Sequence, residues 1–332
     1  MDARTETRTM QAITQRAYGS SEVLTPTTVP RPVPRADEVL IAVRASSLNF
    51  ADVAMVTGRP SLIRAVSGLR RPKHRVPGKD VAGVVEAVGA DVTDVRPGDE
   101  LFGEAVAGVW AQYVCVPARL VAPKPANLTF EQAATLPLAA GTALDCVAGV
   151  RPGQKVLVNG ASGGVGTFTV QVAKALGAEV TGVCSGRNVE LVRGVGADHV
   201  IDYERSDFTS DGTRYDLVVD LVGNRSLAAY RRALTPRGTL HLSGGGGGRI
   251  LGPVLRLVQA LVVNLFVGQH LTPVVATASR AKLDRLRELA EAGSLTPAIE
   301  RTYPLSDAPE AVRRLMAEHA RGKTVLTVAG ER

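Results

Sequence analysis

The sequence predicts an α/β protein with two units, one rich in short strands and one built on a doubly wound parallel sheet. Residues 9–125 contain strand-like runs separated by Gly and Pro, which is typical of a compact β domain or barrel. From about residue 126, apolar strands alternate with helical patterns, which indicates a parallel sheet with helices on both faces. The length of 332 residues allows two such units.

Three extended stretches define the β-rich unit, at residues 38–49, 80–89 and 111–125. The first alternates apolar and polar side chains, and the second is followed by the Gly/Pro turn "VRPGDEL". These features favour strands that have one buried face.

The second unit begins with a helix predicted at 127–144, for which Thr129 is the predicted N-cap. The elements that follow alternate. Strands are predicted at 155–160, 179–184, 199–203, 215–223 and 238–244, helices at 164–176, 188–196 and 226–234, and a last βα unit at 272–293.

After residue 293 the pattern returns to that of the first unit, with a strand, a helix and the final strand "KTVLTV". We expect this tail to fold back onto the first unit. The expected domains are therefore residues 1–125 together with 294–332, and residues 126–293.

Composition argues against several classes of protein. The net charge is +7, but the basic residues are scattered, with no run of five like charges, so no nucleic-acid surface is expected. The three cysteines, Cys115, Cys146 and Cys184, lie far apart and form no CxxC pair, which argues against a disulfide framework or a zinc ribbon. No apolar leader follows the first charged residues, so the cytoplasm is the expected location.

One apolar segment, residues 250–268, requires a comparison with membrane spans. It is short and is interrupted by Pro253, Arg256, Gln259 and Asn264, so no integral span is expected. A buried or interface helix is the first expectation. A lid over an apolar substrate pocket and a membrane contact are the alternatives.

A glycine-rich turn follows the strand at 155–160. Gly163, Gly164 and Gly166 supply a tight bend and a bare backbone at the start of a helix, which is what a pyrophosphate needs. Ala161 occupies the place of the usual first glycine, so the strict GxGxxG is not present. The strand–turn–helix context nevertheless predicts dinucleotide binding.

The end of the next strand distinguishes NAD from NADP. No carboxylate occurs between Glu179 and Glu190, where one would bind a ribose hydroxyl. Ser185 and Arg187 instead offer a hydroxyl and a guanidinium, which suit a 2′-phosphate, and Tyr203 adds a phenolic donor. NADPH is therefore the expected cofactor.

Several stretches, in a characteristic order from about residue 10 to 328, carry a family resemblance. They are "SLNFADV", "VPGKDVAGVVEAVG", "RPGDELFG", "AATLPLAAGTAL", "NGASGGVG", "GADHVIDY" and "GKTVLTV". The chain resembles the medium-chain dehydrogenases/reductases of the quinone oxidoreductase and enoyl reductase type. The resemblance implies a GroES-like β-barrel domain, a Rossmann domain, a cleft between them and pairing into a homodimer.

The resemblance also implies that zinc is absent. Alcohol dehydrogenases of this superfamily have a Cys ligand in the stretch that here reads "LNFAD", and a His in a "GHE" triplet where this chain has Gly78-Lys79-Asp80. With neither ligand present, no metal is expected. Without a metal, a conjugated carbonyl compound or quinone is an easier hydride acceptor than a simple ketone, because the negative charge spreads into an enolate. The predicted function is NADPH-dependent reduction of such an apolar small molecule.

Site residues follow from the same resemblance. Asn49 and Asp52 match the family's N-x-x-D and are the predicted catalytic pair, with Asn49 beside the nicotinamide ribose or the substrate carbonyl and Asp52 bracing the loop. Thr142 matches a threonine near the nicotinamide, and Lys323 is expected near the cofactor. The full predicted cofactor set is Asn49, Thr142, Gly163, Gly164, Val165, Ser185, Arg187, Tyr203 and Lys323.

No proton donor is evident in the sequence. Some relatives carry a Tyr where this chain has Phe50. Lys79 and His74 are nearby in sequence, but a solvated loop is expected to hold both, so solvent is the expected proton source.

Two other functions stay open at this stage. One is reduction of an enoyl thioester on CoA or a carrier protein, for which the basic segment 59–76 would meet the carrier or its phosphopantetheine. The other is NADPH binding without turnover, in a structural or RNA-binding protein.

Overall fold

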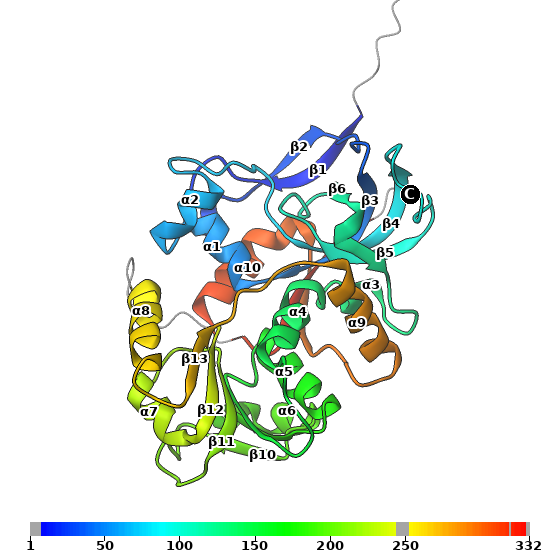
Figure 1. Ribbon diagram of the computed structural model, residues 1–332. Coiled ribbons are helices and arrows are strands. Elements are labelled where there is room, and N and C mark those ends of the chain that lie inside the picture. The colour runs from blue at the N-terminus through cyan, green and yellow to red at the C-terminus, as the bar shows by residue number, and fades with distance from the viewer. Residues whose placement is uncertain (1–7, 244–251, 319, 330–332) are drawn as a thin grey trace, which may run out of the picture.

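A mixed seven-stranded sheet forms the first unit, in the order β14-β15-β3-β4-β5-β7 with β6 paired to β3 (Figure 1). The computed structural model describes residues 8–243, 252–318 and 320–329. The strands of this sheet are β3 (Glu38–Leu48), β4 (Asp80–Val88), β5 (Glu100–Glu104), β6 (Tyr113–Pro117), β7 (Val121–Pro123), β14 (Ile299–Pro304) and β15 (Lys323–Thr327), and β1 (Thr9–Thr14) and β2 (Thr25–Pro30) form a separate ribbon.

The second unit contains a six-stranded sheet in which every strand is parallel to its neighbours, in the order β10-β9-β8-β11-β12-β13. Its strands are β8 (Lys155–Asn159), β9 (Glu179–Cys184), β10 (His199–Asp202), β11 (Tyr215–Asp220), β12 (Leu234–Leu242) and β13 (His270–Pro273). The strands β8, β9 and β11 are mainly apolar and almost wholly buried, as expected where helices cover both faces. The predicted α/β class is confirmed.

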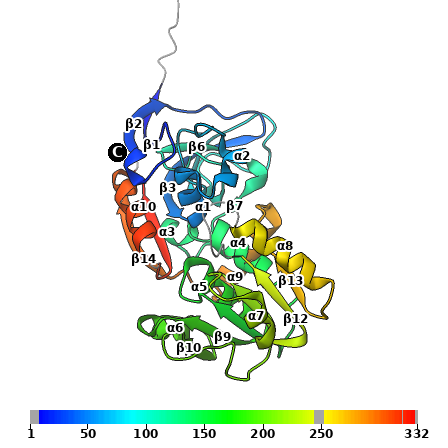
Figure 2. The ribbon, with the colours of Figure 1, turned by 90° about the vertical axis from the view of Figure 1, so that its left-hand side faces the viewer.

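The helices lie around and between the two sheets (Figures 1 and 2). They are α1 (Phe50–Thr57), α2 (Arg64–Ser67), α3 (Phe130–Ala133), α4 (Pro137–Cys146), α5 (Gly164–Ala175), α6 (Val189–Gly194), α7 (Leu227–Ala233), α8 (Gly252–Asn264), α9 (Arg280–Glu291) and α10 (Ala308–Ala317). Between the units, α4 packs in one hydrophobic cluster with Ala45, Ala82 and Ala122 of the first sheet and with Val156 of the second. Small side chains allow this close approach.

The helix predicted at 127–144 is in fact two helices, α3 and α4. Thr129 caps the first, as predicted, and accepts a hydrogen bond from the Gln132 amide at 3.3 Å. Pro137 begins the second, because proline lacks an amide hydrogen and suits only the first turn of a helix. The break directs α4 into the contact between the two units.

The registers of the first sheet bring distant residues together at one edge. In β15, Thr324 lies opposite Leu48 of β3, and in β4, Asp80 lies opposite Ser47 of the same strand. The next residue after β3, Asn49, therefore lies near both Asp80 and Lys323. This juxtaposition positions the candidate site.

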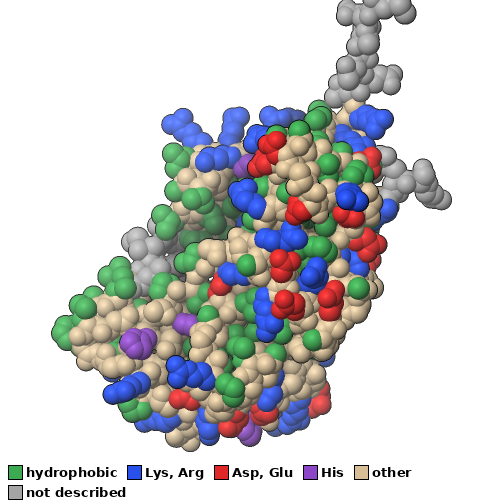
Figure 3. Space-filling view, turned by 45° about the vertical axis from the view of Figure 1, so that its right-hand side comes forward, with side chains coloured by type: hydrophobic (Ala, Val, Ile, Leu, Met, Phe, Trp, Pro, Cys, Tyr) green, Lys and Arg blue, Asp and Glu red, His purple; other side chains and the backbone are tan. Residues whose placement is uncertain are grey.

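Helix α8 covers the second sheet with one face and leaves the other exposed. Ala260 is buried, whereas Leu261 of the helix is 61% exposed, and Leu265 and Phe266, in the turn directly after the helix, are 78% and 80% exposed. Of the expected buried or interface helix, the structure shows one buried face, and the interface stays a prediction. Hydrophobic side chains gather at the left edge of Figure 3, and charges of both signs are interspersed elsewhere on the visible face. Within the described residues, no helix is long and apolar enough to cross a bilayer.

Candidate active site

Asn49 and Asp52 are joined at the start of α1. Asn49 is the N-cap residue, and Asp52 lies one turn inside the helix. The Asp52 Oδ2 atom accepts hydrogen bonds from the backbone amide of Asn49 at 2.9 Å and from its side-chain Nδ2 at 3.3 Å. Asp52 thus holds the loop that presents Asn49, in the bracing role predicted for it.

Asp80 connects this loop to the second unit. Its Oδ2 atom accepts from Nδ2 of Asn49 at 2.9 Å and from the Ser47 hydroxyl at 2.8 Å. Its Oδ1 atom accepts from the backbone amide of Leu138, in the first turn of α4, at 3.0 Å. A buried carboxylate at a helix N-terminus is favoured by the helix dipole and by the unpaired first-turn amides. Asp80 therefore fixes α4 relative to Asn49.

Lys323 completes the cluster from β15. Its ammonium donates to Asn49 Oδ1 at 2.6 Å and to the Leu48 carbonyl at 3.1 Å, and lies 3.9 Å from Asp80 Oδ2. Burial lowers the pKa of Lys323, and the charges of Asp80 and Asp52 oppose this effect. This buried position is compatible with the expected place of Lys323 near the cofactor, and it excludes a lysine on the protein surface.

Asp52 is a carboxyl group in an environment that disfavours its charge. Burial raises its pKa to about 7, and the neighbouring charge of Asp80 adds to the rise, while the Asn49 amide, Lys323 and Lys79 act in the opposite direction. Its Oδ1 atom is buried and has no hydrogen-bond partner among the described residues. Asp52 is one of the residues that line a small cavity.

The glycine turn before α5 has the form that a pyrophosphate requires. A Cβ atom on Gly166 would lie 2.1 Å from the Gly160 carbonyl oxygen, and one on Gly164 would lie 2.8 Å from Cδ of Lys323. Gly163, the N-cap, has no side chain that could occupy the helix terminus, and Val165 follows in the first turn. These residues fit a dinucleotide, because only bare backbone lets its phosphates approach the first-turn amides.

The turn also touches the buried cluster of the first unit. Gly163 forms an isolated parallel bridge with Gly322, and the Gly322 amide donates to the Ser162 carbonyl at 2.8 Å. Gly164 lies against the Lys323 side chain. The predicted phosphate site and the Asn49 loop therefore meet at Lys323.

Thr142 lies in α4, the helix between the two units, one turn after Leu138. Its hydroxyl donates to the Leu138 carbonyl at 2.7 Å, and the residue is buried. Asp80 holds the amide of the same Leu138. The structure thus brings Thr142, Asn49 and Lys323 into one region, although they come from three distant segments.

Ser185, Arg187 and Tyr203 lie together at the carboxyl ends of β9 and β10. Ser185 is buried and its hydroxyl accepts from Nδ2 of Asn188 at 3.2 Å. Arg187 is exposed, and no ion pair is found for it within the described part of the chain. Tyr203 is 42% exposed and follows directly after β10.

A carboxylate that the sequence reasoning missed lies at the same place. Asp202 is opposite Cys184 in the β9–β10 register, and a Cβ atom on Gly186 would lie 2.8 Å from its Oδ2. The sequence at the end of β9 does not reveal this carboxylate, because the neighbouring strand β10 supplies it. Its Oδ1 atom accepts from the Glu204 amide at 3.1 Å, and its Oδ2 atom lies 3.6 Å from Arg205 Nε.

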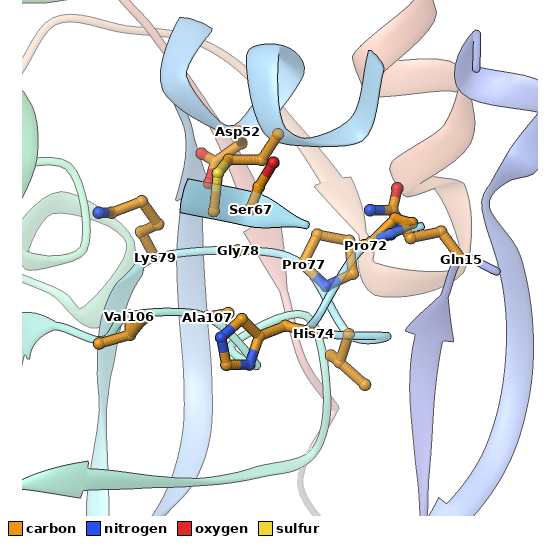
Figure 4. Close-up of a pocket in the computed structure, with 12 residues that line it drawn as sticks. Gln15, Asp52, Ser67, Pro72, His74, Pro77, Gly78, Lys79, Val106 and Ala107 are labelled. Carbon is orange, nitrogen blue, oxygen red and sulfur yellow. The ribbon is translucent and has the colours of Figure 1, made fainter. Parts of the chain in front are cut away.

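The structure does not place Lys79 in a solvated loop, so that expectation is wrong. Its Nζ atom lies 2.8 Å from Glu104 Oε1, and the two side chains are 24% and 14% exposed. Together with Asp52, Lys79 lines a cavity of about 20 Å³ beneath α1 (Figure 4). His74 borders the same cavity from an exposed position, as expected.

Metal ligands are not grouped in the described part of the chain, where no cluster of three or more His, Cys, Asp or Glu side chains could hold an ion. Asn49 lies in the stretch that would carry the Cys ligand of the zinc enzymes, and Lys79 stands in the triplet that would carry their His ligand. The side-chain oxygen of Asn49 accepts a hydrogen bond from Lys323, and the side chain of Lys79 is a cation.

Comparison with known proteins adds the family. Residues 35–126 match the alcohol dehydrogenase GroES-like domain, and residues 195–326 match the zinc-binding dehydrogenase family. The mitochondrial NAD(P)H oxidoreductase RTN4IP1 of Mus musculus is 37% identical, over 94% of this chain and 87% of its own length.

Two solved structures agree with this assignment. The quinone oxidoreductase from Coxiella burnetii superposes with a TM-score of 0.85 at 29% identity, covering 97% of this chain and 100% of the other. The Escherichia coli quinone oxidoreductase complexed with NADPH gives a TM-score of 0.81 at 25% identity, covering 96% and 99%. The chain therefore belongs to the medium-chain dehydrogenases/reductases of the quinone oxidoreductase type, and it is an oxidoreductase with a GroES-like and a Rossmann-like domain that uses a nicotinamide cofactor.

Proposed function

We propose that this protein is an NADPH-dependent reductase that delivers hydride to a conjugated carbonyl compound or a quinone without zinc. The observation that carries the proposal is the position of Lys323, which contacts both Asn49 and the glycine turn at Gly164. A dinucleotide whose pyrophosphate binds at the turn would have its nicotinamide next to a cluster of hydrogen-bonding groups rather than a metal site.

Each part of the cofactor has proposed partners. Gly163, Gly164 and Val165 would bind the pyrophosphate through the first turn of α5. Asn49, Thr142 and Lys323 would border the nicotinamide half. When bound, NADPH supplies the hydride.

The 2′-phosphate is assigned to Ser185, Arg187 and Tyr203, although Asp202 lies beside them. A free carboxylate would repel the phosphate and favour NADH. Asp202, however, is compensated by the Glu204 amide and by Arg205, whereas Arg187 has no competing ion pair among the described residues. We therefore propose that the guanidinium of Arg187 outweighs Asp202 and selects NADPH.

Titration with NADPH and NADH, followed by nicotinamide fluorescence, tests this assignment. We expect NADPH to bind the wild type at least about tenfold more tightly than NADH, and Arg187→Ala to remove that difference, which corresponds to about 1.4 kcal/mol. Arg193→Ala is the matched control, since Arg193 is an exposed arginine of α6 that pairs with Glu190. Equal affinities of the wild type for the two nucleotides would contradict the 2′-phosphate site.

An enoyl thioester is the second candidate acceptor, favoured by one surface feature. Arg70, Arg71, Lys73 and Arg75 are exposed in the stretch that leads to the Lys79 cavity. Such a basic stretch would attract the phosphates of CoA or of a phosphopantetheine. Assays with crotonyl-CoA and with a simple quinone separate the two candidates. Only the thioester hypothesis predicts that the KM for crotonyl-CoA is lower at low salt than at high salt.

We also propose a homodimer formed through the edge of the Rossmann sheet. Strand β13 is an edge strand, and the exposed side chains Leu261, Leu265 and Phe266 of the α8 region lie next to it. Large exposed apolar patches are uncommon on monomers. Light scattering should give a dimer for the wild type and a monomer for Leu265→Asp.

The domain division at residues 125 and 293 and a cytoplasmic location are also proposals, to be tested by limited proteolysis and cell fractionation.

A further inference from the structure

Lys79 is a cation held at the edge of the candidate site by one partner. It lies between Gly78 and Asp80, and Asp80 is the residue that contacts Asn49 and α4. Strand pairing places Asp80 opposite Glu104 on β5, and the Glu104 carboxylate binds the Lys79 ammonium at 2.8 Å. The lysine is therefore fixed to the rigid sheet rather than to a loose loop.

The ammonium of Lys79 retains hydrogen-bonding capacity, in contrast to that of Lys323. An ammonium has three N–H donors, and Glu104 is the one partner of Lys79 among the described residues. Lys323 is nearly inaccessible and is directed to Asn49, Leu48 and Asp80. Of these two lysines, Lys79 is the one that can still donate to a ligand.

The surroundings keep Lys79 positively charged. Burial by itself would lower the pKa of Lys79, but the charges of Glu104, Asp52 and Asp80 outweigh this and raise it above its usual value. In Figure 4 the amine of Lys79 points away from His74 and Gln15. The cavity behind it, at about 20 Å³, has room for about one water molecule, in contact with Asp52.

We propose that Lys79 is a catalytic residue whose ammonium donates a hydrogen bond to the carbonyl oxygen of the acceptor and stabilises the enolate oxygen. The inference rests on the proposed function, since it requires a conjugated acceptor. A fixed positive charge in a partly dry site stabilises a developing oxyanion more than water does. Lys79 would thus supply the electrostatic role that a metal has in zinc-dependent enzymes.

The step balances with NADPH as the reductant and water as the proton source. Hydride forms a C–H bond at the β-carbon, and the π electrons of the C=C bond move to form the enolate, which places the negative charge on the oxygen bound by Lys79. The acceptor gains two electrons and the nicotinamide loses them. Lys79 keeps its proton, and water then protonates the α-carbon as the carbonyl re-forms.

Kinetics of two substitutions test the role. Lys79→Met removes the charge and keeps the length of the side chain, and we expect kcat with an enone to fall by about 100-fold or more. Lys79→Arg keeps a cation, and we expect a loss of about tenfold or less. Lys155→Met, at a half-exposed lysine that begins β8 at the opposite end of that strand from the glycine turn, is the matched control and should match the wild type. The Kd for NADPH should stay within about twofold of the wild-type value in all of these variants.

A binding measurement tests the same contact without turnover. The probe is p-nitrophenol, whose anion absorbs visible light, added to the protein saturated with NADP⁺. We expect the wild type to lower the apparent pKa of the bound phenol by about 1 unit or more, as a nearby cation does, and Lys79→Met to abolish this shift. If Lys79→Met leaves Glu104 unpaired and fails to fold, the double variant Lys79→Met/Glu104→Gln replaces it in both experiments.

The possible failures are distinguishable. A wild type that reduces enones or quinones, with Lys79→Met within threefold of it and no shift for p-nitrophenol, would overturn the role of Lys79 and leave the proposed function intact. A wild type that reduces no conjugated acceptor would overturn the proposed function, and with it the role of Lys79 in catalysis.

Discussion

Asp52 shows how burial changes the chemistry of one residue. The side chain is inaccessible, one oxygen accepts from the Asn49 amide, and the other has no hydrogen-bond partner among the described residues. Asp80, Lys323 and Lys79 face it from three other strands or loops, and His74 borders the cavity. The sequence predicted its bracing role from its spacing after Asn49, but not its raised pKa, because the charges that face it come from distant segments.

We expect Asp52 to make stability dependent on pH. Below about pH 4 the carboxyl is protonated in both the folded and the unfolded chain. As the pH rises towards the folded pKa of about 7, the unfolded chain loses its proton first, so the wild type becomes less stable over this window. Asp52→Asn has no proton to lose. Its stability relative to the wild type should rise by up to about 3 kcal/mol between pH 5 and pH 8, since one pKa unit is about 1.4 kcal/mol.

Urea denaturation of both proteins at the two pH values measures this difference. Asp91→Asn, at an exposed aspartate, is the control and should show no such trend. A difference between Asp52→Asn and the wild type that is independent of pH would contradict the raised pKa of Asp52.

For individual helices and strands, the sequence predicted the type and the order of the elements better than where each one ends and what surrounds it. The strands before and after the glycine turn were predictable, because apolar β-branched runs bounded by Gly are distinctive. The break between α3 and α4 was missed although Pro137 marks it, since the apolar periodicity continues across the proline. The exposed face of α8 could not be predicted, because an apolar pattern alone does not say what covers it.

The turn before α5 should tolerate no side chain at Gly166. The added Cβ would meet the Gly160 carbonyl oxygen at 2.1 Å, and backbone cannot move aside as a flexible side chain can. We expect Gly166→Ala to lower the free energy of unfolding by about 1–3 kcal/mol and to weaken NADPH binding more than tenfold. Thermal denaturation and fluorescence titration measure the two effects.

Gly194→Ala is the matched control for this prediction. Gly194 ends α6, and nothing lies within 4 Å of a Cβ placed there. The substitution should leave nucleotide binding unchanged and stability equal or slightly higher. Full NADPH affinity in Gly166→Ala would show that the turn does not hold the phosphates.

At the scale of the whole molecule, a buried network joins the two units. Asp80 accepts from Asn49 in the first unit and from Leu138 at the start of α4, and Lys323 reaches from β15 to the glycine turn. The order of the stretches that carry the family resemblance implied such a cleft only through that resemblance. The network itself could not be predicted, because strand registers, which the sequence does not state, bring its members together.

Asp80→Ala should destabilise the protein strongly, since it leaves Lys323 buried without its carboxylate. We expect a loss of about 3–5 kcal/mol in urea denaturation. Adding Lys323→Met should recover part of this loss, so that the double variant is more stable than the sum of the single losses predicts. Strictly additive losses would mean that Asp80 and Lys323 do not act together.

We propose that hydride passes to a conjugated acceptor at a site without a metal. The most direct test of this proposal is NADPH oxidation, followed by absorbance, in the presence of an enone or a quinone by protein treated with a strong chelator. We expect turnover with at least one of these acceptors, at a rate that neither chelation nor added zinc changes. Absence of turnover with every conjugated acceptor, or activity that chelation abolishes and zinc restores, would contradict it.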